Sequence, residues 1–154
     1  METKSYLLGP ALAVLCCQSS AFAALGGDMR SVSADRELMH GQLRSTLMQQ
    51  YDLHEITTSG GTLIHEYVTP QGKVFAVTWR GPFPPNLQQL FGGYYDQFQS
   101  AAAASAEAHP GTHRTLTISQ HDFVMQSMGR MRAFHGKAYI PSLVPSGVSI
   151  ATLQ

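Results

Sequence analysis

The sequence has few cysteines and few charges, and it lacks a long hydrophobic run. Cys16 and Cys17 both lie near the N-terminus, so disulfide bonds cannot staple the residues that follow. Basic and acidic residues number ten each and form no blocks of one sign, which argues against a nucleic-acid-binding surface. The apolar stretch at residues 6–17 has about twelve residues, whereas a membrane-spanning helix needs roughly twenty. We therefore expect no nucleic-acid partner and no stable membrane span.

The first 23 residues follow the order of a secretory signal peptide. Lys4 precedes the apolar stretch, and Ala21 and Ala23 after it fit the Ala-x-Ala rule for cleavage. We predict cleavage after Ala23 and export to the periplasm or the extracellular space. Residues 24–154 are then long enough to bury a hydrophobic core, so we expect them to form a single globular domain.

Two segments have the pattern of helices. Residues 33–50 are predicted to form the first helix, because Ser33 can cap it and Leu43 and Leu47 recur at a spacing of four. Asn86 is expected to cap a second helix, in which apolar residues follow the three-and-four spacing of a buried face. Gly92 and Gly93 within that helix suggest that its backbone packs closely against another element.

Runs with a period of two, separated by turn residues, predict six strands. Three lie between the helices and three follow the second one, at residues 53–57, 62–69, 73–79, 115–119, 123–127 and 131–140. In the third run, Val74, Ala76 and Thr78 are expected to face one way, and the residues between them the other way. Apolar groups on both faces favour a central position in the sheet.

These elements predict the α+β class. The expected order is helix, three strands, helix, three strands, and the expected architecture is an antiparallel sheet of about six strands with two helices on one face. Such an arrangement buries the apolar side of both kinds of element.

The segment from Glu66 to Pro82 resembles a family of exported proteobacterial proteins of unknown function, DUF2844. The resemblance continues at Ala24–Asp28, at Asn86–Tyr94 and at Met131–Pro141. It therefore extends over nearly all of residues 24–154. The resemblance implies export and a single domain, but it implies no activity and no functional residues.

Two histidine-glutamate pairs are the sharpest chemical feature. His54-Glu55 and His65-Glu66 lie on consecutive predicted strands joined by a Ser-Gly-Gly turn, so the four side chains could converge and bind zinc or copper. A shift of one residue in the hairpin would instead place the two histidines on opposite faces. Polar pairing across strands on a solvated face is the simpler interpretation.

An aromatic and proline set is the best candidate for a binding surface. It comprises Trp79, Phe83, Pro84, Pro85 and Tyr95. A rigid proline loop with aromatic side chains loses little conformational freedom on binding, which favours recognition of a partner. Core packing is the competing interpretation for Trp79, whereas Phe83 and Tyr95 are expected to be exposed.

Catalysis has little support in the sequence. Residues 24–154 contain no thiol and no Gly-x-Ser-x-Gly motif for an activated serine. We therefore favour a non-catalytic exported module that binds an envelope protein or another envelope component. The alternative is a metal-binding or hydrolytic protein that uses the histidine-glutamate hairpin.

Overall fold

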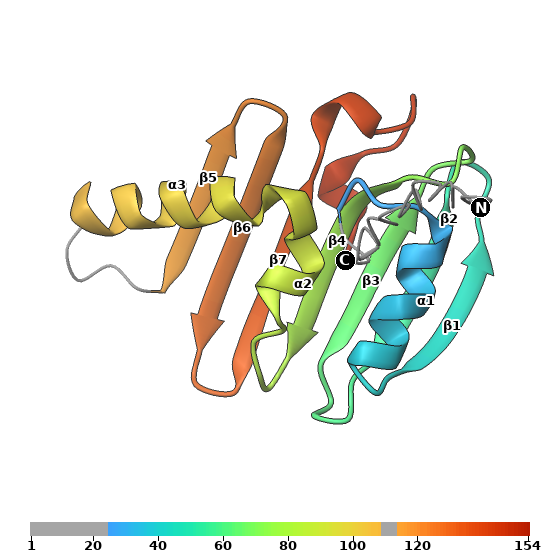
Figure 1. The fold of residues 1–154 in the computed structure, drawn as a ribbon, viewed down its shortest axis with the longest axis horizontal. Helices are drawn as coiled ribbons and strands as arrows, with labels where there is room; N and C mark the ends of the chain where they lie inside the picture. Colours follow the sequence, from blue (N-terminus) through green and yellow to red (C-terminus); the bar gives the residue numbers. More distant parts are fainter. Residues whose placement is uncertain (1–24, 109–113) are drawn as a thin grey trace, which may run out of the picture.

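The computed structural model describes residues 25–108 and 114–154, which contain one antiparallel sheet of seven strands (Figure 1). The predicted signal peptide lies outside the described residues. The spatial order of the strands is β1-β2-β3-β4-β7-β6-β5. The strands are β1 (Gln42–Leu47), β2 (Asp52–Thr57), β3 (Leu63–Val68), β4 (Val74–Gly81), β5 (Thr115–Gln120), β6 (Phe123–Arg130) and β7 (Ala133–Tyr139).

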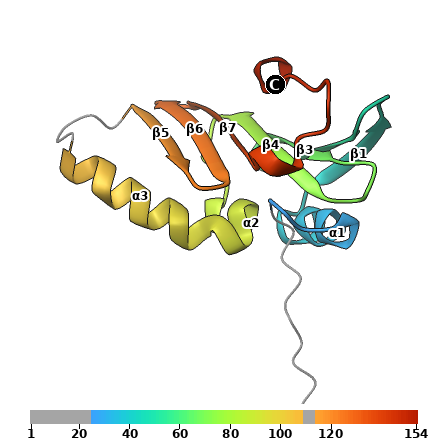
Figure 2. The same ribbon diagram turned by 90° about the horizontal axis from the view of Figure 1, so that it is seen from above.

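The helices all lie against one face of this sheet, and the C-terminal segment covers part of the other face (Figure 2). The first helix is α1 (Met29–Leu38). A second helical stretch consists of α2 (Leu87–Phe91), the short 3₁₀ turn η1 (Gly92–Tyr94) and α3 (Tyr95–Ala108). The C-terminal segment contains the 3₁₀ turns η2 (Pro141–Leu143) and η3 (Ile150–Thr152). The predicted α+β class and the placement of the helices on one face are confirmed.

The predicted helix over residues 33–50 is wrong in its extent. Asp28 caps α1, and its side chain accepts a hydrogen bond of 2.9 Å from the backbone N–H of Arg30. The helix ends at Leu38, and His40 adopts a positive φ of 47°. The chain then reverses and adds β1 to the edge of the sheet, which makes seven strands instead of six. Leu47 on β1 is 82% exposed, so the spacing of four did not mark a buried helical face.

The second helical stretch begins where the sequence predicted, since the Asn86 side chain accepts a hydrogen bond of 3.2 Å from the N–H of Gln89. It bends at Gly92, which has a φ of 48° and a ψ of −116°. A Cβ added at Gly93 would meet no atom within 4 Å. The close backbone packing predicted for the two glycines is therefore wrong at Gly93, and Gly92 allows the change of direction.

The six predicted strands are all present, and β4 is central as expected. It pairs with β3 on one side and β7 on the other. The predicted alternation of its side chains holds from Ala76 to Trp79 but is wrong at Val74 and Phe75, because Val68 pairs with Val74 while Tyr67 pairs with Ala76. Phe75 is therefore the extra residue of a β-bulge, and both Phe75 and Ala76 join the cluster on the helix-free face.

Two apolar clusters pack against the sheet, one on each face. The larger one lies under the helices and contains Trp79, Phe91 and Phe123, with ring centroids 5.4–6.0 Å apart for neighbouring pairs. The smaller one lies under the C-terminal segment, where Tyr67 and Leu153 are buried together with the bulged residues of β4. The remainder of the helix-free face stays open, and this determines where a ligand can approach.

Candidate binding groove

One row of polar side chains crosses all seven strands. Its members are direct cross-strand partners, and such partners point to the same face of a sheet. His65 contacts the C-terminal segment, which places the row on the helix-free face. In spatial order the row is Arg44, Glu55, His65, Thr78, Lys137, Gln126 and Thr117.

The two rows of side chains that flank this polar row differ in how far the C-terminal segment covers them. On one side, Leu53, Tyr67, Ala76 and Tyr139 form an apolar row that packs against the C-terminal segment. On the other side lies a mixed row of Leu63, Arg80, His135, Met128 and Thr115. The C-terminal segment therefore covers the apolar row and touches the polar row at His65 and Lys137, while most of the mixed row stays exposed.

A groove of about 640 Å³ follows the polar row and the mixed row. Leu153 and Gln154 lie along one side of it, where the C-terminal segment ends. The sheet provides its floor through β3, β4, β7, β6 and β5. The lining residues are Leu63, His65, Thr78, Trp79, Arg80, Thr115, Thr117, Gln126, Ser127, Met128, His135, Gly136, Lys137, Leu153 and Gln154.

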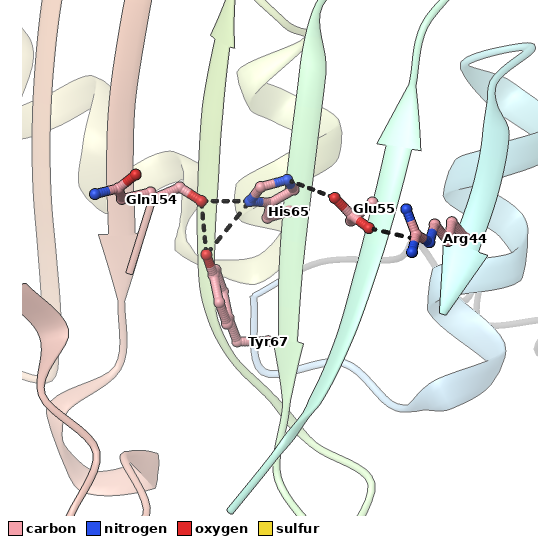
Figure 3. Close-up of polar contacts among 5 residues, drawn as sticks. All are labelled: Arg44, Glu55, His65, Tyr67 and Gln154. Atoms are coloured by element: carbon pink, nitrogen blue, oxygen red, sulfur yellow. Dashed lines mark hydrogen bonds and ion pairs between the residues drawn. The ribbon is translucent and has the colours of Figure 1, made fainter. Parts of the chain in front are cut away.

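A chain of polar contacts anchors the end of the C-terminal segment beside the groove (Figure 3). The Tyr67 hydroxyl donates a hydrogen bond of 2.8 Å to the main-chain oxygen of Gln154, and His65 Nδ1 contacts the same oxygen. His65 Nε2 lies 3.4 Å from Glu55, whose other carboxylate oxygen is 3.8 Å from Arg44. Burial raises the pKa of Tyr67, which keeps the hydroxyl protonated as a donor.

The charged side chains that line the groove are basic. Arg80, His135 and Lys137 line it, and none of the described residues that line it is Asp or Glu. We call these three residues the basic corner. Arg80 and His135 are direct partners across β4 and β7, and Lys137 follows His135 by two residues on the same face. The arrangement can hold a negatively charged group.

The match to a family model agrees with the resemblance noted between Glu66 and Pro82. The model of a protein family of unknown function, DUF2844, matches residues 21–153. The chain belongs to the DUF2844 family. No curated protein and no solved structure matches the chain. Within the described ranges of this DUF2844 member, no helix has both the length and the apolar character needed to cross a membrane.

The histidine-glutamate pairs of this DUF2844 member do not meet at one site. In the hairpin, His54 lies opposite Glu66 and Glu55 lies opposite His65. His54 and Glu66 face the helices, whereas Glu55 and His65 face the groove side. Within residues 25–108 and 114–154, no group of three His, Cys, Asp or Glu side chains is placed to hold a metal ion.

Glu66 belongs instead to a buried polar cluster under α1. Its carboxyl group lies beside that of Asp35, and the Gln89 amide donates a hydrogen bond to Asp35 Oδ1. Burial raises the pKa of Asp35 to about 6 and the pKa of Glu66 well above its ordinary value. His54, on the same side of the sheet, has its pKa lowered by burial, and its Nδ1 lies 2.8 Å from the Ser45 hydroxyl.

The aromatic and proline set is divided between the core and the surface. Trp79 is only 4% exposed and packs on Phe91, so its ring belongs to the core apart from the part that reaches the groove floor. Tyr95 is half-buried. Phe83 is 58% exposed, and with Pro84 and Pro85 it lines a separate hollow of about 320 Å³ beside the end of α1.

Sequence reasoning missed the basic corner and the polar row. Polar residues at alternate positions were visible in Thr115–Gln120 and Phe123–Arg130, but they are also typical of a solvated sheet face. The pairing of β4 with β7 brings residues 80 and 135 together across more than fifty positions of sequence. A pattern read along one strand at a time carries no signal for such a pairing.

Proposed function

We propose that this protein is an exported, non-catalytic binding module of the cell envelope, and that the groove on the helix-free face is its ligand-binding site. The observation that carries the proposal is the row of polar side chains that lines the groove from His65 to Thr117. Export to the periplasm or the extracellular space follows from the signal-peptide pattern of residues 1–23.

The form and chemistry of the groove support binding. Ligand sites are concave, and they combine apolar contacts with a few polar groups that fix orientation. Here Leu63, Met128 and Leu153 supply apolar contacts, while Thr78 and Gln126 supply hydrogen-bonding groups. The polar contacts of Gln154 hold one wall in place, so the site is largely formed before a ligand arrives.

A second surface could also contact a partner. The proline loop presents Phe83 at 58% exposure, and the backbone oxygen of Phe83 accepts a hydrogen bond of 2.8 Å from the Thr62 hydroxyl. This anchoring keeps the loop ordered, which favours its use in recognition. The groove and the proline loop have no lining residue in common, so variants can separate their roles.

The test is crosslinking and pull-down of the full-length protein from the envelope of its own host. Thr117→Trp blocks the groove, and Ser119→Trp is its matched control on the same strand and face, outside the groove lining. Loss of an envelope component in Thr117→Trp but not in Ser119→Trp supports the groove. The mass of the exported protein checks cleavage after Ala23.

Other outcomes have clear meanings. If Thr117→Trp still captures the envelope component and Phe83→Ser does not, the binding site is the proline loop and not the groove. Absence of any specific component with the wild-type protein, or retention in the cytoplasm with residues 1–23 intact, would overturn the proposal.

A further inference from the structure

We propose that the basic corner of the groove binds an anionic group, a carboxylate or a phosphate, carried by a small polar ligand. This inference rests on the proposed function, since it concerns the same groove. It adds the chemical class of the ligand, which neither the family nor the fold assigns.

The geometry of the corner supports a single anion site. Arg80 on β4 and His135 on β7 are direct cross-strand partners, and side chains in such positions lie within reach of one group. Lys137 projects from the same face of β7 two residues further on. Three donors from two central strands thus face one volume of the groove.

No described Asp or Glu side chain lines the groove or pairs with the corner. Within the described part of the chain, no ion pair includes Arg80 or Lys137. Glu55, in the same polar row, is already engaged by Arg44 and His65. Charge complementarity therefore favours an anion over a neutral or cationic group.

Two main-chain oxygen atoms near the corner leave hydrogen-bond donors available for an anion. Lys137 Nζ donates a long hydrogen bond of 3.4 Å to the main-chain oxygen of Ile150, and an ammonium group has two further N–H donors for a ligand. The main-chain oxygen of Gln154 is already contacted by Tyr67 and His65. Donors remain available at the corner, and the main-chain oxygens of Ile150 and Gln154 already have hydrogen-bond partners.

The rest of the groove indicates the body of the ligand. From the corner, the polar row continues through Gln126 to Thr117, which offer amide and hydroxyl groups for hydrogen bonds. Met128 adds an apolar contact beside His135. A small organic acid or a phosphate monoester with a polar body fits this sequence of contacts.

The experiment is an NMR titration of the purified protein with inorganic phosphate and, separately, with citrate, at constant ionic strength set with potassium chloride. We expect saturable shifts of the backbone amides around Arg80, His135 and Lys137 with at least one anion. Lys137→Gln and Arg80→Gln should each weaken binding about tenfold, because each removes a charged hydrogen-bond donor. Arg130→Gln, an exposed arginine at the end of β6 outside the groove lining, should leave binding unchanged.

Comparison of the citrate and phosphate titrations distinguishes a carboxylate ligand from a phosphate ligand. If phosphate binds, cosedimentation with phosphatidylglycerol vesicles that is lost in Lys137→Gln assigns a lipid headgroup, and absence of cosedimentation assigns a soluble phosphate. Shifts that stay linear through millimolar anion, or equal weakening in Arg130→Gln, would overturn the anion site. If Thr117→Trp still abolishes capture of the envelope component in that case, the binding function stands and only the ligand class is wrong.

Discussion

Asp35 on α1 and Glu66 on β3 are neighbouring carboxyl groups, and the pair is almost wholly buried. Asp35 is 0% and Glu66 1% exposed. Two buried, neighbouring carboxylates repel each other, so the pair is most stable with at least one group protonated. The pair connects the N-terminal helix to the centre of the sheet, and its ionisation opposes that connection.

We predict that this pair makes the protein less stable as the pH rises. The folded-state pKa values of both groups are raised, so the folded protein holds protons that the unfolded chain releases above about pH 4. Stability from the pair is complete below that pH and falls as the pH rises through about 6. His54 contributes in the opposite direction, because its folded pKa is lowered. The Glu66→Gln variant isolates the effect of the pair.

Urea unfolding of Glu66→Gln and wild type should give similar free energies at pH 4. By pH 8 the variant should be the more stable of the two, because it has no carboxyl proton to lose at position 66. Glu37→Gln, on the exposed side of α1, is the control and should show no such trend. A difference that does not change with pH would contradict the assignment.

The separation of the histidine-glutamate pairs predicts that metal does not stabilise the protein. His54 and Glu66 face the helices, and Glu55 and His65 face the groove side, so each face offers only one histidine and one glutamate of the four. We expect EDTA to leave the melting temperature unchanged, because loss of a bound metal would lower it. About one equivalent of zinc or copper in the purified protein, removed by either His54→Ala or His65→Ala, would favour the metal-binding alternative.

Gly136 on β7 is predicted to be intolerant of any side chain. An added Cβ would lie 2.3 Å from Trp79 Cζ2 and 2.7 Å from the backbone oxygen of Gln126. Gly136→Ala should therefore lower the free energy of unfolding by about 1–3 kcal/mol, as overpacking does. Gly93→Ala is the matched comparison, since it meets no atom within 4 Å, and it should be neutral or stabilising by up to about 1 kcal/mol. Equal effects in urea melts would refute the close approach of Trp79.

Leu153 is predicted to hold the wall of the groove in place. Its side chain is 6% exposed and packs with Tyr67 and Phe75. Leu153→Ala should cost about 2 kcal/mol or more locally and increase hydrogen exchange in residues 141–154, because it leaves a cavity under that segment. Ala151→Ser, at an exposed position of the same segment, should leave exchange unchanged. Unaltered exchange in Leu153→Ala would show that other contacts hold the wall.

Much of the fold could be predicted from the sequence because its signals are local. The Ser59-Gly60-Gly61 turn closes the hairpin of β2 and β3, and Gly61 has the positive φ that such a turn requires. The edge strand β1 was missed, because Leu43 and Leu47 also fit a helical spacing. Gly41 is evidence against one continuous helix over residues 33–50, because an added Cβ there would lie 2.6 Å from Ile56. This close approach follows from the pairing of β1 with β2, so the sequence around Gly41 does not reveal it.

The sequence by itself determined the α+β class, six of the seven strands, the start of the second helical stretch and the central place of β4. Those features depend on periodicity, capping and turn residues within short segments. Tertiary structure alone decided the face on which each histidine lies, since a shift of one residue in the hairpin reverses it. It also decided the basic corner, because Arg80 meets His135 only through the pairing of β4 with β7. Contacts between distant segments depend on how the whole sheet packs, and no local pattern records them.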